Sequence, residues 1–204
     1  MSTTPEILIV ATGVANSASV LAAFRRMDTK PRLSNDPNEI RDCSHLVLPG
    51  VGAYGPAAQR LDELELRTAL QERISSERPT LAICLGMQLL CEGSDESVGT
   101  RGLGAVPGIV SPFPEGAPVP QLGWNWVEPA GCELIEAGHA YFANTYRLQD
   151  KPDGWSCAQT NYSTPFVSAL ERGPILACQF HPELSGEWGA RLLARWIERG
   201  LEVA

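Results

Sequence analysis

A cysteine stands where an apolar run turns into a helical pattern, a position suited to covalent chemistry. The segment Thr80-Leu-Ala-Ile-Cys84-Leu-Gly86-Met-Gln-Leu-Leu90 predicts a buried strand, then the cysteine, then a helix, with small Ala82 and Gly86 two residues to either side. This is the form of a nucleophile elbow, whose tight turn exposes the central side chain. The helix N-terminus would stabilise a thiolate, and its free N–H groups could receive an oxyanion. A buried structural cysteine is the alternative, which the other five cysteines fit better.

A thiolate that performs acyl transfer needs a base, and the chain offers three histidines. His45 and His139 stand at the start of predicted strands, which favours structural or exposed roles. The third follows an apolar run in Cys-Gln-Phe-His181-Pro-Glu183. Since the carboxyl ends of parallel strands line one crevice, Cys84 and His181 can meet there. Glu183, beyond a stiffening proline, could orient the imidazole, so the three compose a Cys–His–Glu triad; strand-end polarity and a helix-terminal acid are the alternatives.

A glycine-rich segment, Leu48-Pro-Gly50-Val-Gly52-Ala-Tyr54, follows another apolar run. Glycines there allow unusual backbone dihedrals and a close approach to a ligand. Phosphate binding is the general alternative, but the segment lacks the Gly-Lys-Ser of a P-loop. We therefore expect this loop to donate N–H groups to an oxyanion opposite Cys84.

Strands that alternate with helices must position these residues. Four short runs are apolar throughout and predict central strands covered on both faces: Ile7–Ala11, His45–Leu48, Thr80–Cys84 and Ile175–Phe180. Three segments carry a helical apolar stripe: Ser17–Met27, Leu61–Ile74 and Trp188–Arg199. This alternation predicts parallel βαβ units, and hence an α/β fold with an open, mostly parallel, doubly wound sheet.

The stretch from Gly99 to about Leu170 has a different pattern, with short strands between turns rich in Pro and Gly. The expected strands are Val119–Leu122, Trp124–Glu128, Ala140–Tyr146 and Phe166–Leu170. They predict an antiparallel or mixed edge of the sheet, and Ser111–Pro118 is expected to be a loop. Neither a repeat nor a linker divides the chain, so we expect residues 1–204 to form one domain.

Composition narrows the function classes. The 204 residues include 16 Lys and Arg and 24 Asp and Glu, a net charge of −8, which gives no broad electrostatic reason to bind nucleic acid. The six cysteines are scattered without a Cys-x-x-Cys pair, so we expect no metal site, no cofactor and no redox dithiol. The first apolar run is too short for a signal sequence or a membrane span. We expect reduced thiols in the cytoplasm.

Three motifs together resemble those of the class I, triad-type glutamine amidotransferases: Leu48–Tyr54, Ile83–Leu90 and Gln179–Glu183. Two further segments narrow the resemblance to the glutaminase subunits of imidazole glycerol phosphate synthase: Val119-Pro-Gln-Leu-Gly-Trp-Asn125 and Tyr141-Phe-Ala-Asn-Thr-Tyr-Arg147. The resemblance runs from about Ile7 to Arg199, with the motifs in the family's order.

The resemblance implies an enzyme of L-histidine biosynthesis that hydrolyses glutamine to glutamate and ammonia. It implies Cys84 as the nucleophile that forms a thioester, His181 as the base and Glu183 as the residue that orients it. The ammonia would pass to a (β/α)8-barrel cyclase subunit in a heterodimer. That partner would make imidazole glycerol phosphate and aminoimidazole carboxamide ribonucleotide.

The resemblance also implies roles for residues around the triad. It implies an oxyanion hole from Gly50, Val51 and Leu85. It implies that the glutamine head is held by Gly52, Gln88 and Thr145. It implies a surface toward the cyclase formed by Pro120, Leu122, Trp124 and Asn125.

Three departures from the family pattern bear on coupling to a partner. The usual Tyr-Gly-x-Gly-Asn is here Ala11-Thr-Gly-Val-Ala-Asn16, Asn144 replaces a histidine, and Leu184 replaces a lysine. A class I amidotransferase that serves another acceptor pathway, or a non-catalytic regulatory relative, therefore stays open. The intact triad favours an active enzyme over the non-catalytic relative.

Overall fold

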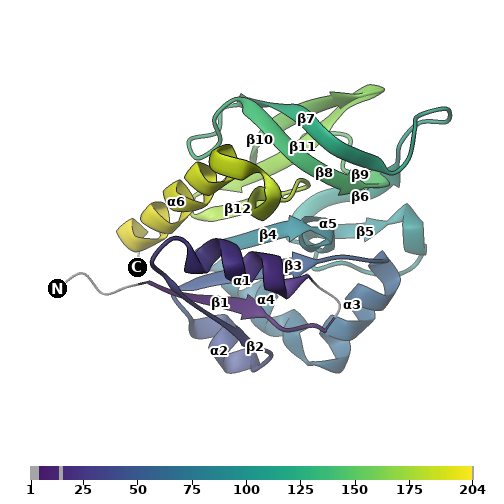
Figure 1. Ribbon diagram of the computed structural model, residues 1–204. Helices are drawn as coiled ribbons and strands as arrows, with labels where there is room; N and C mark the ends of the chain where they lie inside the picture. Colours follow the sequence, from purple (N-terminus) through teal and green to yellow (C-terminus); the bar gives the residue numbers. More distant parts are fainter. Residues whose placement is uncertain (1–4, 14–15, 204) are drawn as a thin grey trace.

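A nine-stranded sheet runs through the computed structural model of the protein, which describes residues 5–13 and 16–203 (Figure 1). In the order in which they lie side by side, its strands are β2 (Lys30–Ser34), β1 (Glu6–Val10), β3 (His45–Gly50), β4 (Thr80–Cys84), β12 (Ile175–Cys178), β11 (Thr164–Arg172), β10 (Ser156–Tyr162), β7 (Gln121–Ala130) and β8 (Gly138–Asn144). The strands β2, β1, β3, β4 and β12 are parallel to one another. The four expected apolar strands are all among these five.

Helices cover both faces of the parallel part. They are α1 (Ser17–Arg25), α2 (Pro37–Asp42), α3 (Tyr54–Glu63), α4 (Leu66–Ser75), α5 (Leu85–Leu90) and α6 (Gly186–Val203). Figure 1 shows α1 and α6 on one side of the sheet and α2, α3 and α4 on the other. Alternate residues of β1, β3, β4 and β12 enter two separate apolar cores, one under α1 and α6 and one under α2 to α5. The expected doubly wound α/β fold is confirmed. Among the described residues, no helix combines the length and the apolar character needed to cross a membrane.

The helix expected over Leu61–Ile74 is wrong in its bounds. The segment spans the end of α3 and most of α4, because Glu65 has a left-handed φ of 56° and interrupts the helix. The break lets both Leu61 and Leu66 be buried. The edge strand β2 and the helix α2 were not expected, since Lys30–Ser34 is partly exposed and lacks an apolar run.

The other part of the sheet is antiparallel, as expected. β11 pairs antiparallel with β12, and β10, β7 and β8 continue the pattern outward. The two strands expected between 119 and 128 are one strand, β7, and the strand expected at Ala140–Tyr146 is divided between β8 and β9 (Tyr146–Arg147). β9 joins β5 (Cys91–Ser94) and β6 (Val106–Pro112) in a small second sheet. The expected loop is found over 113–118, while Ser111 and Pro112 belong to β6.

Candidate active site

Cys84 occupies a strained turn between β4 and α5. Its φ of 55° and ψ of −111° lie outside the regions that residues with a side chain normally adopt. The turn brings α5 against β3, where a Cβ on Gly86 would lie 2.0 Å from the carbonyl oxygen of Leu48. Only glycine fits there, which explains why the residue two positions after the cysteine is small. The expected strand–cysteine–helix elbow is therefore present in the fold.

His181 and Glu183 come from the segment that follows β12, the strand beside β4. The Nδ1 atom of His181 lies 2.8 Å from Oε1 of Glu183, and both side chains are nearly buried. The backbone N–H of His181 donates to the carbonyl of Tyr141 on β8, 2.9 Å away. Glu183 belongs to a short 3-10 turn, η2 (Pro182–Leu184). The carboxylate thereby fixes which imidazole nitrogen is left to face the sulfur.

The pKa of His181 results from two opposing effects. Burial of the imidazole favours the neutral form and would lower the pKa. Hydrogen bonds to the side chains of Cys84 and Glu183 outweigh burial and raise the pKa of His181 to about 10. The imidazole therefore holds a proton more tightly than a free imidazole does, because it lies beside both a sulfur and a carboxylate.

The other cysteines and histidines are in different surroundings. Burial raises the pKa of the five remaining thiols, on Cys43, Cys91, Cys132, Cys157 and Cys178. All six cysteines are free thiols. The side chain of His45 is buried and contacts the carbonyl oxygen of Ile197, and burial lowers its pKa. His139 is exposed on β8 and stacks edge-on against Trp126.

The glycine-rich loop begins beside the cysteine, because Gly50 at the end of β3 is in register with Cys84. A Cβ on Gly50 would lie 2.9 Å from both the backbone nitrogen of Gly86 and Cβ of Leu85. Gly52 has a left-handed φ of 93°, and Val51 between the two glycines is exposed. The loop thus stands against the N-terminus of α5.

A cavity of about 250 Å³ lies between the elbow, the loop and His181. The expected site residues that line it are Val51, Gly52, Cys84, Leu85, Gln88, Thr145 and His181. Glu183 and Gly50 are not among its lining residues and support those that are. The structure therefore brings the predicted triad, loop and head-binding residues around one cavity.

Glu96 also lines this cavity and was not anticipated from the sequence. It belongs to the 3-10 turn η1 (Asp95–Ser97), and its Oε2 accepts a hydrogen bond of 2.9 Å from the backbone N–H of Tyr54. Ser97 accepts from the N–H of Gly55 in the same way, so the turn caps α3. The segment Ser-Asp-Glu-Ser has the composition of an ordinary surface turn, and no spacing links it to Cys84.

The departures from the family pattern have definite surroundings. Asn144 is buried in the cavity wall, and its Nδ2 donates to the carbonyl of Tyr146 at 3.0 Å. Leu184 is exposed, directly after Glu183. In the altered N-terminal segment, residues 14 and 15 lie outside the described residues.

The residues expected to face a partner are on β7 and just before it. Leu122 and Trp124 are 68% and 57% exposed, and Pro120 is exposed as well. Strand alternation puts Asn125 on the opposite face of β7, where its Nδ2 donates to the carbonyl of Asn161. Trp124 packs edge-on against Tyr141, whose carbonyl holds the backbone of His181. Trp124 is thus linked through Tyr141 to the backbone of His181.

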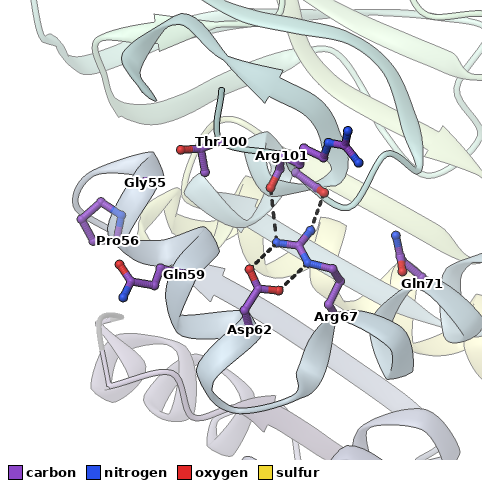
Figure 2. Close-up of a pocket in the computed structure, with 9 residues that line it drawn as sticks. Gly55, Pro56, Gln59, Asp62, Arg67, Gln71, Thr100 and Arg101 are labelled. Carbon is purple, nitrogen blue, oxygen red and sulfur yellow. Dashed lines mark hydrogen bonds and ion pairs between the residues drawn. The ribbon is translucent and has the colours of Figure 1, made fainter. Parts of the chain in front are cut away.

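A larger cavity, of about 710 Å³, lies beside α3 and α4, and Cys84 is not among its lining residues (Figure 2). Arg67 crosses it and forms a two-pronged ion pair with Asp62, with N–O distances of 2.5 and 3.0 Å. The same guanidinium donates to the carbonyls of Gly102 and Arg101. Asp62 and Arg67 thus neutralise one another, and none of the lining residues is a cysteine or histidine. Within 5–13 and 16–203, no group of three or more His, Cys, Asp or Glu side chains is arranged to hold a metal ion.

Comparison with known proteins agrees with the geometry. The family described as Glutamine amidotransferase class-I matches residues 16–198. The chain is 41% identical to imidazole glycerol phosphate synthase subunit HisH of Symbiobacterium thermophilum, over 94% of this chain and 92% of that protein. It is 37% identical to imidazole glycerol phosphate synthase hisHF of Arabidopsis thaliana, over 91% of this chain and 33% of that protein.

Solved structures resemble the fold at lower identity. The structure of PurLQS from Thermotoga maritima has a TM-score of 0.74 at 16% identity, covering 96% of this chain and 99% of that one. The nucleophile elbow, the His–Glu pair and the family match over most of the chain agree. The chain belongs to the class I glutamine amidotransferase family.

Proposed function

We propose that the protein is the glutaminase subunit of an imidazole glycerol phosphate synthase in histidine biosynthesis. The observation that carries the proposal is the Cys84–His181–Glu183 constellation on a cavity, in a chain 41% identical over nearly its full length to a protein with that subunit name. Free cysteine thiols support a reducing compartment such as the cytoplasm.

The proposed reaction is amide hydrolysis through a covalent intermediate. His181 takes the thiol proton of Cys84, and the thiolate Sγ bonds to the side-chain carboxamide carbon of glutamine, whose carbonyl oxygen becomes an oxyanion. His181 gives a proton to the leaving nitrogen, which departs as ammonia and leaves a thioester. A water oxygen then bonds to the acyl carbon and passes a proton to His181. The C–S bond breaks, its electron pair returns to sulfur, and glutamate leaves.

The oxyanion needs preorganised donors. The N–H of Leu85, at the start of α5, and the loop of Gly50 and Val51 are the proposed donors. The two donors would approach the carbonyl oxygen from opposite walls of the cavity. Val51 is exposed between two glycines, so its peptide planes can reorient at low cost.

The amino-acid head of glutamine carries an ammonium and a carboxylate. We assign its binding to Gly52, Gln88 and Thr145. The carboxylate of Glu96 adds a negative charge on the same cavity and suits the ammonium group.

The ammonia would pass to a cyclase partner, which we propose is a (β/α)8 barrel in a heterodimer. The relative named hisHF supports a second catalytic part, since this chain spans only 33% of that protein. The exposed apolar surface that such docking requires is supplied by Leu122, Trp124 and Pro120. Asn125 supports this surface through its hydrogen bond to the carbonyl of Asn161 on the opposite face of β7.

Reconstitution with a cyclase subunit tests the proposal. The Cys84→Ala variant should lose glutamine-dependent synthesis of imidazole glycerol phosphate by at least about 10⁴-fold, because no other group can form the thioester. Synthesis from added ammonium salts should persist. Cys43→Ala, which removes a half-buried thiol elsewhere, is the matched control and should keep wild-type turnover. Near-normal use of glutamine by Cys84→Ala would refute the proposal.

A further inference from the structure

Gln179 is a fully buried polar side chain next to the reacting sulfur. It directly follows β12, whose Cys178 is in register with Ile83, so Gln179 stands beside Cys84. Its backbone N–H donates to the carbonyl of Ser168 at 2.9 Å, which fixes the main chain. Its Nε2 lies 3.8 Å from Sγ of Cys84, within hydrogen-bonding reach of sulfur.

The orientation of the Gln179 amide follows from its neighbours. The carbonyl oxygen of Tyr146 can only accept, so the amide atom of Gln88 that meets it at 3.1 Å must be the donor Nε2. The same Nε2 donates to Gln179 at 2.9 Å, and the atom that receives it must be Oε1. The NH₂ group of Gln179 is thereby turned toward the sulfur. If the Gln179 amide were flipped, its NH₂ group would face the NH₂ group of Gln88, and neither can accept a hydrogen bond.

We propose that Gln179 is a catalytic hydrogen-bond donor to Cys84, which stabilises negative charge on sulfur; this rests on Cys84 being the nucleophile proposed above. The charge is present twice in the cycle: before sulfur attacks the carboxamide, and when the thioester C–S bond breaks and its electron pair returns to sulfur. A neutral donor can serve at both moments, because it does not exchange protons with the substrate.

The donor complements His181. The imidazole gives and takes protons during turnover, so its hydrogen bond to sulfur changes as the reaction proceeds. The Gln179 N–H keeps its proton throughout. Gln88, which is itself fixed by its hydrogen bond to the carbonyl of Tyr146, holds the Gln179 amide in place, so the donor is preorganised.

The rate at which iodoacetamide alkylates Cys84 in the intact chain, followed by mass spectrometry from pH 5 to 9, tests this role without glutamine or partner. Gln179→Met removes the donor, and Gln179→Glu replaces it with an oxygen. A hydrogen bond to a charged group corresponds to a factor of about 10 to 100, so alkylation at pH 7 should fall by at least roughly tenfold in both variants. Gln159→Glu, on the exposed side of β10, makes the same charge change and should match the wild type.

A merely structural role predicts a different result, namely unchanged alkylation in any variant that folds. In the reconstituted enzyme, kcat should fall while KM for glutamine stays within about twofold, since Gln179 does not line the cavity. Folded Gln179→Met alkylated at the wild-type rate would overturn the proposal.

The wild-type chain provides a test that needs no variant. The side-chain ¹⁵N–H₂ resonances of Gln179 should shift on alkylation of Cys84, and unshifted resonances would also overturn it. If alkylated wild type still hydrolysed glutamine, Cys84 would not be the nucleophile. If alkylation abolished hydrolysis while the Gln179 variants behaved like wild type, only the donor role would fail.

Discussion

The parallel and antiparallel parts of the sheet differ in how their strands meet solvent. β3, β4 and β12 are buried along their whole length, and the triad and the loop stand at or just beyond their carboxyl ends. β7 is covered on one face only and exposes Leu122, Trp124 and Trp126 on the other. Covering both faces of a strand leaves its end as the place where side chains can meet a ligand. Covering one face leaves a surface for another protein.

The largest effect should come from the parallel part. His181→Ala should lower glutamate release by on the order of 10⁴-fold, because the substitution removes the proton carrier. Glu183→Gln should lower it by less, because Glu183 only orients the imidazole. Glutamate release is measured with the cyclase present. His139→Ala, an exposed histidine of the antiparallel part, is the control and should keep wild-type activity. Equal activity of His181→Ala and wild type would mean that the base lies elsewhere.

The next prediction concerns activation of the triad, in the parallel part, by a partner that docks on the antiparallel part. The isolated chain should be a poor glutaminase that cyclase and its nucleotide substrate activate roughly a thousandfold, which requires a preference of about 4 kcal/mol for the active loop orientation. A misdirected N–H at Val51 would cost about 10²–10³ in rate. Glutamate release is compared for the chain alone, with cyclase, and with cyclase plus nucleotide. Full activity of the chain alone would contradict the switch and leave the triad unaffected.

A smaller effect is expected for the exposed face of β7. Leu122→Ser and Trp124→Ala should each raise the Kd for the cyclase about 10- to 100-fold, since central apolar anchors dominate interface energy. Leu33→Ser is the matched control, because Leu33 is exposed on β2 at the opposite edge of the sheet. Calorimetric titration gives the Kd, and equal weakening by all three changes would argue against a docking surface on β7.

The last prediction concerns stability. The pKa of His181 is raised to about 10 from an ordinary value of 6.5, so the folded state holds this proton more tightly than the unfolded chain. The resulting stabilisation is fully present below pH 6.5 and is lost as pH rises through 10. Urea unfolding at pH 6, 8 and 10 should therefore show a decline in the free energy of unfolding that His181→Ala lacks. If the free energy of unfolding changed with pH in the same way in the wild type and in His181→Ala, stabilisation by the His181 proton would be excluded.

Sequence reasoning succeeded best for the parallel part. Buried strands such as Thr80–Cys84 are apolar throughout, and the cysteine, histidine and glycine motifs stand directly at their ends. The edge strand β2 was missed, because Lys30–Ser34 pairs on one side only and needs few apolar residues. The break at Glu65 was missed as well, since a single left-handed residue leaves the apolar spacing almost unchanged.

The cavity was predictable only in part. Residues at strand ends could be assigned from local pattern, whereas Glu96 reaches the cavity through its hydrogen bond to the backbone of Tyr54. Contacts of this kind join segments 42 positions apart and leave no trace in local spacing. The orientation of Gln179 likewise depends on Gln88 and Tyr146, which only the folded chain brings together.

The contact between Gly86 and the carbonyl of Leu48 limits what can move in this active site. Because α5 is wedged against β3, the nucleophile and the root of the facing loop form one rigid block. Adjustment is then left to the peptide planes on either side of Val51, which can rotate without translating any strand. Such a rotation would not change the small-angle scattering of the protein or the distances measured between its elements. It would appear in the amide spectrum of two or three residues, where control of this enzyme should be sought.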